Sequence, residues 1–253
     1  MEKSQRHALI LQRITRDGIL AVAPVASEIG VSEETIRRDI KEMERQGLVR
    51  RRHGGAELPD PLAEPSWQER MRSNAVGKCA IGHAVARLVR PGDSLLIDAG
   101  TTNTFVAQAL KDVSNLTVVT NSTDVARALA FRPDNDVYMA GGRLTSDDGA
   151  SLGQSAIAFI AAFRVRLAII SAAAVHATDG IMAHKAAEAE FTRAAMGRAD
   201  HVILVADRTK LDRTAVVRVA GLNAVQTFVT DASVPESLAE ALASAGVTTV
   251  IAD

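Results

Sequence analysis

Several features that would place the chain in a specialised class are missing. Cys79 is the only cysteine among 253 residues, which excludes an intrachain disulfide and a zinc site built on several thiolates. The chain also lacks the run of about 18 apolar residues that a membrane-spanning helix needs. Residues 1–6 lack the apolar segment of a signal peptide. We therefore expect a cytoplasmic protein without membrane contact, metal or cofactor.

Aromatic residues and net charge are both scarce. Only 3% of the residues are aromatic, whereas 47% are hydrophobic with many alanines and valines, which suits helices packed on a parallel sheet. The formal net charge of −1 excludes an overall basic surface for nucleic acid. Basic residues nevertheless cluster, because residues 37–53 hold seven Lys/Arg and three Asp/Glu. A nucleic-acid site is therefore expected near the N-terminus.

The N-terminal pattern predicts two helices separated by a tight turn, after a first helix that ends near Gly18. The second helix ends at Gly30, and Ser32 can cap the third. Apolar residues at positions 36, 40 and 43 form one stripe on that third helix, and basic residues lie roughly opposite. This is the layout of a recognition helix in the major groove. The contacts expected from it are Ser32, Glu34, Thr35, Arg37, Arg38 and Lys41.

Residues 48–56 predict a strand, a turn at paired glycines and a return strand, as in the wing of a winged helix. Arginines on a protruding hairpin contact phosphates or the minor groove, which sets affinity more than sequence choice. From this hairpin we expect DNA contacts by Arg50, Arg51, Arg52, His53 and Gly54. Exposed arginines alone are usually just solvated, so the conjunction with the helices carries the prediction.

The chain is long enough for two domains, and residues 57–65 contain three prolines, which neither a helix nor a central strand tolerates. We expect a DNA-binding domain at 1–58, a linker at 59–76 and an α/β domain at 77–253. Seven apolar segments alternate with helical stretches in that domain, which predicts a Rossmann-like fold with a mainly parallel sheet. They lie at residues 95–97, 118–119, 137–139, 168–170, 202–205, 228–229 and 249–251.

Small polar residues follow several of these strands, where ligands bind in parallel α/β sheets. The segment 98–102 combines glycine, two hydroxyls and the start of a helix, which together can cradle a phosphate. Any one of these loops could be a capped turn that binds no ligand. Three such loops at the same edge of the sheet favour a ligand-binding site. Lys210 follows the strand at 202–205 and could neutralise a phosphate, although a surface lysine is usually only solvated.

Both halves of the chain resemble the DeoR family of bacterial repressors. The N-terminal match consists of Val-Ser-Glu-Glu-Thr-Ile-Arg-Arg-Asp-Ile at 31–40, then Glu44, Gly47, Leu48 and His-Gly-Gly-Ala at 53–56. The C-terminal match includes the motifs at 98–102, 120–122, 141–142, 188–190 and 207–210. Within the family, Trp67 and residues 141–149, 153 and 159 look most like glycerol-3-phosphate regulon repressors. Residues 171–176 depart from the glycines that are usual in the family, and the added methyl groups would reshape the pocket.

The resemblance implies a sensor fold like that of pentose-phosphate isomerases and related transferases. It implies a repressor of a carbohydrate or polyol catabolic operon, bound to double-stranded operator DNA as a homo-oligomer, either dimer or tetramer. A phosphorylated sugar or glycerol-3-phosphate would release it. The implied effector contacts are Asp98, Gly100, Thr101, Thr102, Thr120, Asn121, Ser122, Gly141, Gly142, Arg143, Glu188, Asp207 and Lys210.

Two alternatives stay open at this point. The chain could be a phosphosugar isomerase or transferase with an appended DNA-binding module, since Asp98, Glu188, Asp207 and Lys210 are suited to acid–base chemistry. The DNA-binding module argues against an enzyme, and no catalytic residue is predicted. An architectural DNA protein without an effector is the third possibility.

Overall fold

The computed structural model describes residues 2–46, 48–52, 54–58, 64–132 and 134–253, and the chain divides into two compact units. Unit 1 is Met1–Ala63 and unit 2 is Glu64–Asp253. The predicted domain boundaries after residues 58 and 76 stay a prediction. Within the described residues, no helix is both long and apolar enough to span a membrane.

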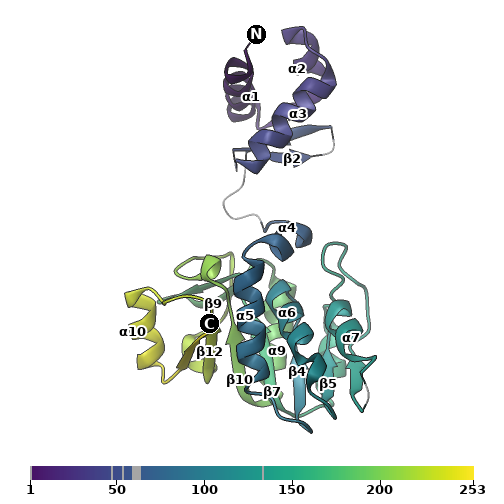
Figure 1. The fold of residues 1–253 in the computed structure, drawn as a ribbon, viewed down its shortest axis with the longest axis vertical. Coiled ribbons are helices and arrows are strands. Elements are labelled where there is room, and N and C mark those ends of the chain that lie inside the picture. The colour runs from purple at the N-terminus through teal and green to yellow at the C-terminus, as the bar shows by residue number, and fades with distance from the viewer. Residues whose placement is uncertain (1, 47, 53, 59–63, 133) are drawn as a thin grey trace. The chain divides into compact units, whose positions relative to one another are not determined.

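Unit 1 consists of three helices and a small antiparallel sheet with the strand order β1-β3-β2 (Figure 1). Its elements are α1 (Lys3–Asp17), β1 (Ile19–Ala21), α2 (Val22–Ile29), α3 (Glu33–Arg45), β2 (Arg50–Arg52) and β3 (Gly55–Glu57). The predicted hairpin is β2–β3, and β1 adds a third strand through the pairing of Ala21 with Gly55. A Cβ on Gly55 would lie 1.9 Å from the carbonyl oxygen of Leu20, so this strand pairing requires a glycine.

The core of unit 1 joins α1 to the apolar stripe of α3. Ile36, Ile40 and Met43 are at most 1% exposed, as their spacing predicts, and they pack with Ile10 and Ile14 of α1. Their burial turns the opposite, basic face of α3 toward solvent.

Unit 2 is built on a seven-stranded, fully parallel sheet with the order β13-β12-β10-β7-β4-β5-β6. Every segment that the sequence predicts as a strand is present. The strands are β4 (Ser94–Ile97), β5 (Thr117–Thr120), β6 (Asp136–Met139), β7 (Val165–Ser171), β10 (Ala199–Val205), β12 (Thr227–Thr230) and β13 (Thr248–Ile251). The α/β fold class expected from the sequence is confirmed.

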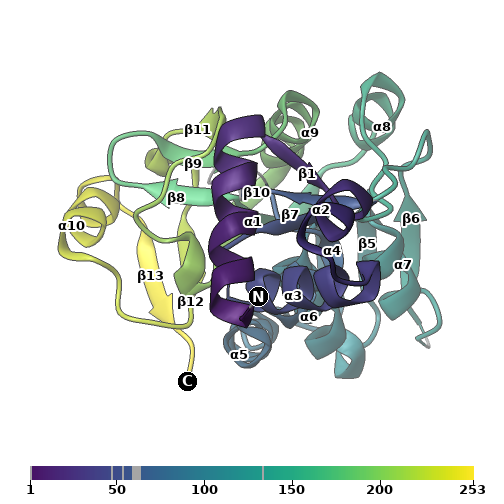
Figure 2. The same cartoon turned by 90° about the horizontal axis from the view of Figure 1, so that it is seen from above.

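Helices cover both faces of the sheet (Figure 2). On one face lie α5 (Ala75–Ala86), α6 (Thr101–Ala109) and α7 (Thr123–Leu129), and on the other α8 (Gln154–Ile160) and α9 (Ala186–Met196). Side chains alternate between the faces along each strand, so Ile97 packs under the first group and Leu96 under the second. The last helix is α10 (Glu236–Ser244), and short 3-10 turns are η1 (Leu110–Asp112), η2 (Arg208–Lys210) and η3 (Leu222–Ala224).

A second, three-stranded antiparallel sheet was not predicted. It consists of β8 (Ala174–His176), β9 (Gly180–Ala183) and β11 (Val217–Ala220), in the order β11-β9-β8. It packs through Val175, Ile181 and Val219 against the core around Phe228. The departure at residues 171–176 thus leads directly into an edge strand of this sheet.

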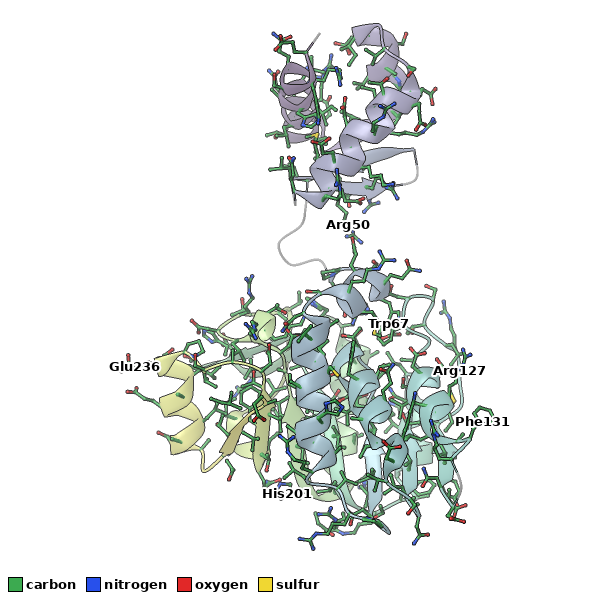
Figure 3. The ribbon with its side chains drawn as sticks, in the orientation of Figure 1. Arg50, Trp67, Arg127, Phe131, His201 and Glu236 are labelled. Carbon is green, nitrogen blue, oxygen red and sulfur yellow. The ribbon has the colours of Figure 1, made fainter. Side chains whose placement is uncertain are left out.

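Part of the expected linker belongs to unit 2, because helix α4 (Trp67–Arg72) contacts α6. Trp67 of α4 lies at the opposite end of this unit from His201, which is near the start of β10 (Figure 3). Helix α4 therefore lies at the carboxyl end of the sheet, where the loops that follow the strands gather.

Candidate functional site

The N-terminus of α3 is capped as the sequence predicts. The Ser32 hydroxyl accepts a hydrogen bond from the backbone amide of Thr35 at 3.2 Å, and the two hydroxyls lie 2.9 Å apart. Glu33 and Glu34 in the first turn favour the positive end of the helix dipole. Glu34 is exposed and Thr35 is half-buried, so both are at the surface that a recognition helix presents.

Helix α3 is anchored to α1 through a buried carboxylate. Asp39 is 4% exposed and accepts two hydrogen bonds from the Arg6 guanidinium, Nε to Oδ2 at 2.6 Å and Nη2 to Oδ1 at 3.1 Å. Burial alone would raise the pKa of Asp39, but the hydrogen bonds and charge of Arg6 hold it below its usual value. This bidentate pair fixes how α3 is presented.

Basic side chains on α3 and the hairpin fall into two groups. Arg37 pairs with Glu33 at 2.5 Å, Arg52 pairs with Glu57 at 2.5 Å, and Arg51 lies 3.6 Å from Glu44. By contrast, Arg38, Lys41, Arg45 and Arg50 are exposed and make no side-chain ion pair or hydrogen bond with the residues that the structure describes.

Helix α3 and the hairpin enclose one concave surface within unit 1. Arg37, Arg51, Arg52 and Gly54 line it together with Val22, Ile40 and Gly55. The hairpin turns at Gly54, whose φ is +78°. His53, which was also expected to contact DNA, lies outside the described residues.

In unit 2, a cavity of about 80 Å³ opens beside the loops that follow β4 and β7. Six of the effector residues expected from the sequence line it, namely Asp98, Gly100, Thr101, Thr102, Glu188 and Lys210. These six residues come from three separate parts of the fold, namely the segment 98–102, helix α9 and the turn η2.

The first turn of α6 presents backbone amides to this cavity. Gly100 precedes the helix with φ +136°, and among the described residues no side chain caps its amides. A Cβ on Gly100 would lie 2.3 Å from the Ser171 hydroxyl oxygen, so the close approach of these two loops requires a glycine. Uncapped amides at a positive helix end bind anions, and phosphate above all.

Asp98 is a buried carboxyl group with a perturbed pKa. Its Oδ1 accepts from the Ala99 amide at 2.7 Å, and its Oδ2 lies 2.7 Å from the Thr192 hydroxyl. Burial raises the pKa of Asp98 to about 6, although these hydrogen bonds oppose the rise. The Thr192 hydroxyl also lies 2.9 Å from the carbonyl oxygen of Glu188, yet it has only one proton to donate. If Asp98 were protonated, its own proton would be donated to the Thr192 oxygen. The Thr192 proton would then be available for the carbonyl oxygen of Glu188.

Two cationic side chains line the same cavity. Burial lowers the pKa of Lys210, and the positive charge of Arg70 lowers it further, while Asp207 opposes the change. Arg70 pairs with Glu64, Nη1 to Oε1 at 2.8 Å, and Glu64 in turn lies 3.1 Å from Lys185 Nζ. Cations, helix-end amides and carboxylates thus share one cavity, which suits a ligand with a phosphate and hydroxyl groups.

Family models match both units. A DeoR-like helix-turn-helix domain covers residues 6–61, and the DeoR C-terminal sensor domain covers residues 73–232. The chain belongs to the DeoR family. The resemblance expected from the sequence is thereby confirmed, and the chain is a DNA-binding transcriptional regulator and not an enzyme.

DeoR-family relatives match over almost the full length. The glycerol-3-phosphate regulon repressor of Escherichia coli is 34% identical over 96% of this chain and 96% of its own. The repressor CsqR of Escherichia coli is also 34% identical, over 92% of this chain and 89% of its own. Among solved structures, ribose 5-phosphate isomerase A of Methanocaldococcus jannaschii is similar at a TM-score of 0.41 and 14% identity, over 55% of each chain.

Other DeoR motif residues do not line the cavity. Thr120 donates to the carbonyl of Ile97 at 2.6 Å, Asn121 accepts from the Ala99 amide at 2.9 Å, and Ser122 caps α7. These three buried residues shape the loops behind the cavity. The remaining expected residues outside its lining are Gly141, Gly142 and Arg143, which are exposed, and Asp207, which is buried. Their contact with an effector stays a prediction.

Five polar cavity residues of this DeoR-family chain are not among the effector contacts expected from the sequence: Glu64, Arg70, Asp148, Ser171 and Thr192. The sequence around Arg70 does not predict its place in the cavity, because it shows only a short helix after a proline-rich segment and not what that helix packs against. Thr192 lies one turn after Glu188 on α9, a spacing that puts both residues on one helix face. That spacing could have found it.

Proposed function

We propose that this DeoR-family regulator represses a carbohydrate or polyol catabolic operon in the cytoplasm and leaves its operator when a phosphorylated polyol or sugar fills the cavity of unit 2. The observation that carries the proposal is the cavity lining, in which uncapped amides of α6 face the same space as Lys210 and Arg70. Relatives named as glycerol-3-phosphate regulon repressors make glycerol-3-phosphate the first candidate effector.

The cavity chemistry divides naturally between a phosphate and hydroxyl groups. Helix-end amides and the two cations supply charge-assisted hydrogen bonds to phosphate oxygens. Asp98 and Glu188 carry carboxyl oxygens that accept hydrogen bonds from hydroxyls. A ligand that has only one of the two group types would leave the other set of cavity groups unpaired, which is costly.

DNA binding is assigned to α3 and the hairpin. Arg38 and Lys41 project from the exposed face of α3 without an intramolecular ion pair among the described residues, so they are free to contact bases or phosphates. Because one short helix reads few base pairs, we propose a dimer or tetramer that presents two recognition helices to a palindromic operator.

A ligand screen with an operator-release assay tests the proposal. Glycerol-3-phosphate and a set of sugar phosphates would be compared with glycerol and the matching free sugars, which differ only by the phosphate. At a hundredfold excess over Kd, a true effector stabilises the protein by about 2.7 kcal/mol, so its melting temperature rises. The same compound should lower affinity for a selected operator duplex in fluorescence anisotropy. Operator affinity that is unchanged by every phosphorylated compound would contradict the proposal.

A further inference from the structure

Arg70 reaches the effector cavity from the first helix that follows the DNA-binding unit. Its side chain is 11% exposed and is surrounded by acceptors: Glu64 at 2.8 Å, Asp147 at 2.8 Å and the Pro65 carbonyl at 3.0 Å. Its guanidinium also lies 5.4 Å from the centre of the Trp67 ring. The guanidinium of Arg70, which an anionic ligand in the cavity would bind, is therefore already paired with two carboxylates of the protein.

Asp147 holds helix α4 at two points. Its Oδ1 accepts the backbone amide of Trp67, the first residue of α4, at 3.0 Å, and its Oδ2 accepts from Arg70 at 2.8 Å. Burial would raise the pKa of Asp147, but both hydrogen bonds keep it below its usual value. The carboxylate thus stays charged and occupies the Arg70 guanidinium, a group that also binds phosphate.

A buried lysine holds the other end of α4. Lys78 is 2% exposed, and its Nζ donates to the carbonyls of Arg70 at 2.5 Å and Ser73 at 2.7 Å. The same Nζ lies 3.7 Å from Asp207 Oδ2, while Asp207 Oδ1 caps η2 by accepting the Thr209 amide at 2.9 Å. Since η2 ends at Lys210, Lys78 connects α4 to the turn that carries the second cavity cation.

We propose that Arg70 detects the effector. The phosphate of the effector binds the Arg70 guanidinium in place of Asp147, which loosens the attachment of α4, and the freed α4 alters DNA binding by unit 1. This proposal rests on the proposed function, since it assigns a regulatory role to the same cavity. Phosphate is a strong competitor, because it carries more charge than a carboxylate and accepts both arms of the guanidinium. Ligand binding and the Asp147 contact then exclude each other, which is the unequal affinity for two states that a switch requires.

Variants at both partners give opposite expected results. Arg70→Ala should weaken glycerol-3-phosphate binding by about tenfold to a hundredfold in calorimetry, since a charge-assisted hydrogen bond is lost. Asp147→Asn keeps the shape but removes the competing charge, so this variant should bind the ligand more tightly and leave the operator at a lower ligand concentration. If Asp147 only stabilised α4, the variant would show unchanged or weaker binding. Arg72→Ala, on the same helix, is the matched control and should behave as the wild type.

The experiment separates this proposal from the proposed function. A wild-type protein that no phosphorylated compound binds or releases overturns both. A wild-type protein that responds, together with Arg70→Ala and Asp147→Asn proteins that respond identically to it, overturns only the role of Arg70. Should Arg70→Ala not fold, as judged by its melting transition, Arg70→Lys replaces it. That variant keeps the charge but loses the fork, so weaker binding supports the proposal and unchanged binding contradicts it.

Discussion

Gly100→Ala should destabilise unit 2 in a way that depends on Ser171. Gly100 has φ +136°, a region that is open almost only to glycine, and forcing alanine into it costs about 1–3 kcal/mol. The new Cβ would also lie 2.3 Å from the Ser171 hydroxyl oxygen and 3.4 Å from its Cβ. Overpacking of this kind adds about 1–3 kcal/mol, so we expect a total loss of about 2–6 kcal/mol.

The two contributions can be separated with a double-mutant cycle. In a Ser171→Gly background the clashing hydroxyl is gone, and Gly100→Ala should cost only the backbone strain. The coupling free energy between the two positions is then about 1–3 kcal/mol. Urea denaturation followed by circular dichroism measures the free energy of unfolding in all four proteins, provided that the slope with denaturant stays constant.

Gly141→Ala is the matched control for this cycle. A Cβ on Gly141 meets no atom of the described residues within 4 Å, and its φ is not in the positive range, so the substitution should leave stability within about 0.5 kcal/mol. If Gly100→Ala cost the same with and without Ser171, the close approach of the two loops would be refuted. A Gly100→Ala protein as stable as the Gly141→Ala protein would refute the strain argument as well.

Three further predictions follow from the two units. Arg38→Ala should weaken operator binding by about 1–3 kcal/mol in anisotropy titrations without changing the melting temperature, whereas Arg164→Ala in unit 2 should not. Asp39→Asn should lower the unfolding free energy of unit 1 by about 3 kcal/mol at pH 7; because the folded pKa of Asp39 is lowered, this loss should shrink as pH falls below about 4. Asp98 has a raised folded pKa of about 6, so its ionisation should cost unit 2 about 3 kcal/mol as pH rises from about 4 to 6, and Asp98→Asn should remove that pH dependence in urea titrations.

The main sheet was predictable from the sequence because its strands are buried on both faces. Such strands appear as short, continuous apolar segments, and Leu95–Ile97 and Val202–Val205 are examples. The cavity residues Asp98 and Gly100 were found for the same reason, since they follow such a segment directly. The carboxyl ends of parallel strands share one edge, so position in the chain was enough to place them.

Contacts between distant segments were not predictable in this way. Strand β11 pairs with β9 across more than thirty residues, and each strand has only four, too few for a pattern to stand out. Arg70 meets Asp147 only because α4 folds back onto the loop before α8. Two single residues did carry a signal. Asp39 lies on the apolar side of α3, and Lys78 is the only charged Lys, Arg, Asp or Glu residue of the mainly apolar helix α5; both are buried with partners.

The burial of Lys78 is better explained by the position of α4 than by stability. Burial lowers the pKa of Lys78, and the positive charges of Lys210 and Arg70 lower it further, although Asp207 at 3.7 Å opposes the change. Replacing such a pair with apolar side chains is often neutral or stabilising, so a stable core alone would not call for a lysine here. An ammonium group can, however, donate to two carbonyls at the end of α4 and still face a carboxylate, which no apolar side chain can do. Lys78 thereby holds α4 in one defined position beside the cavity. Because α4 has a defined position, loss of the Arg70–Asp147 contact can shift it to another.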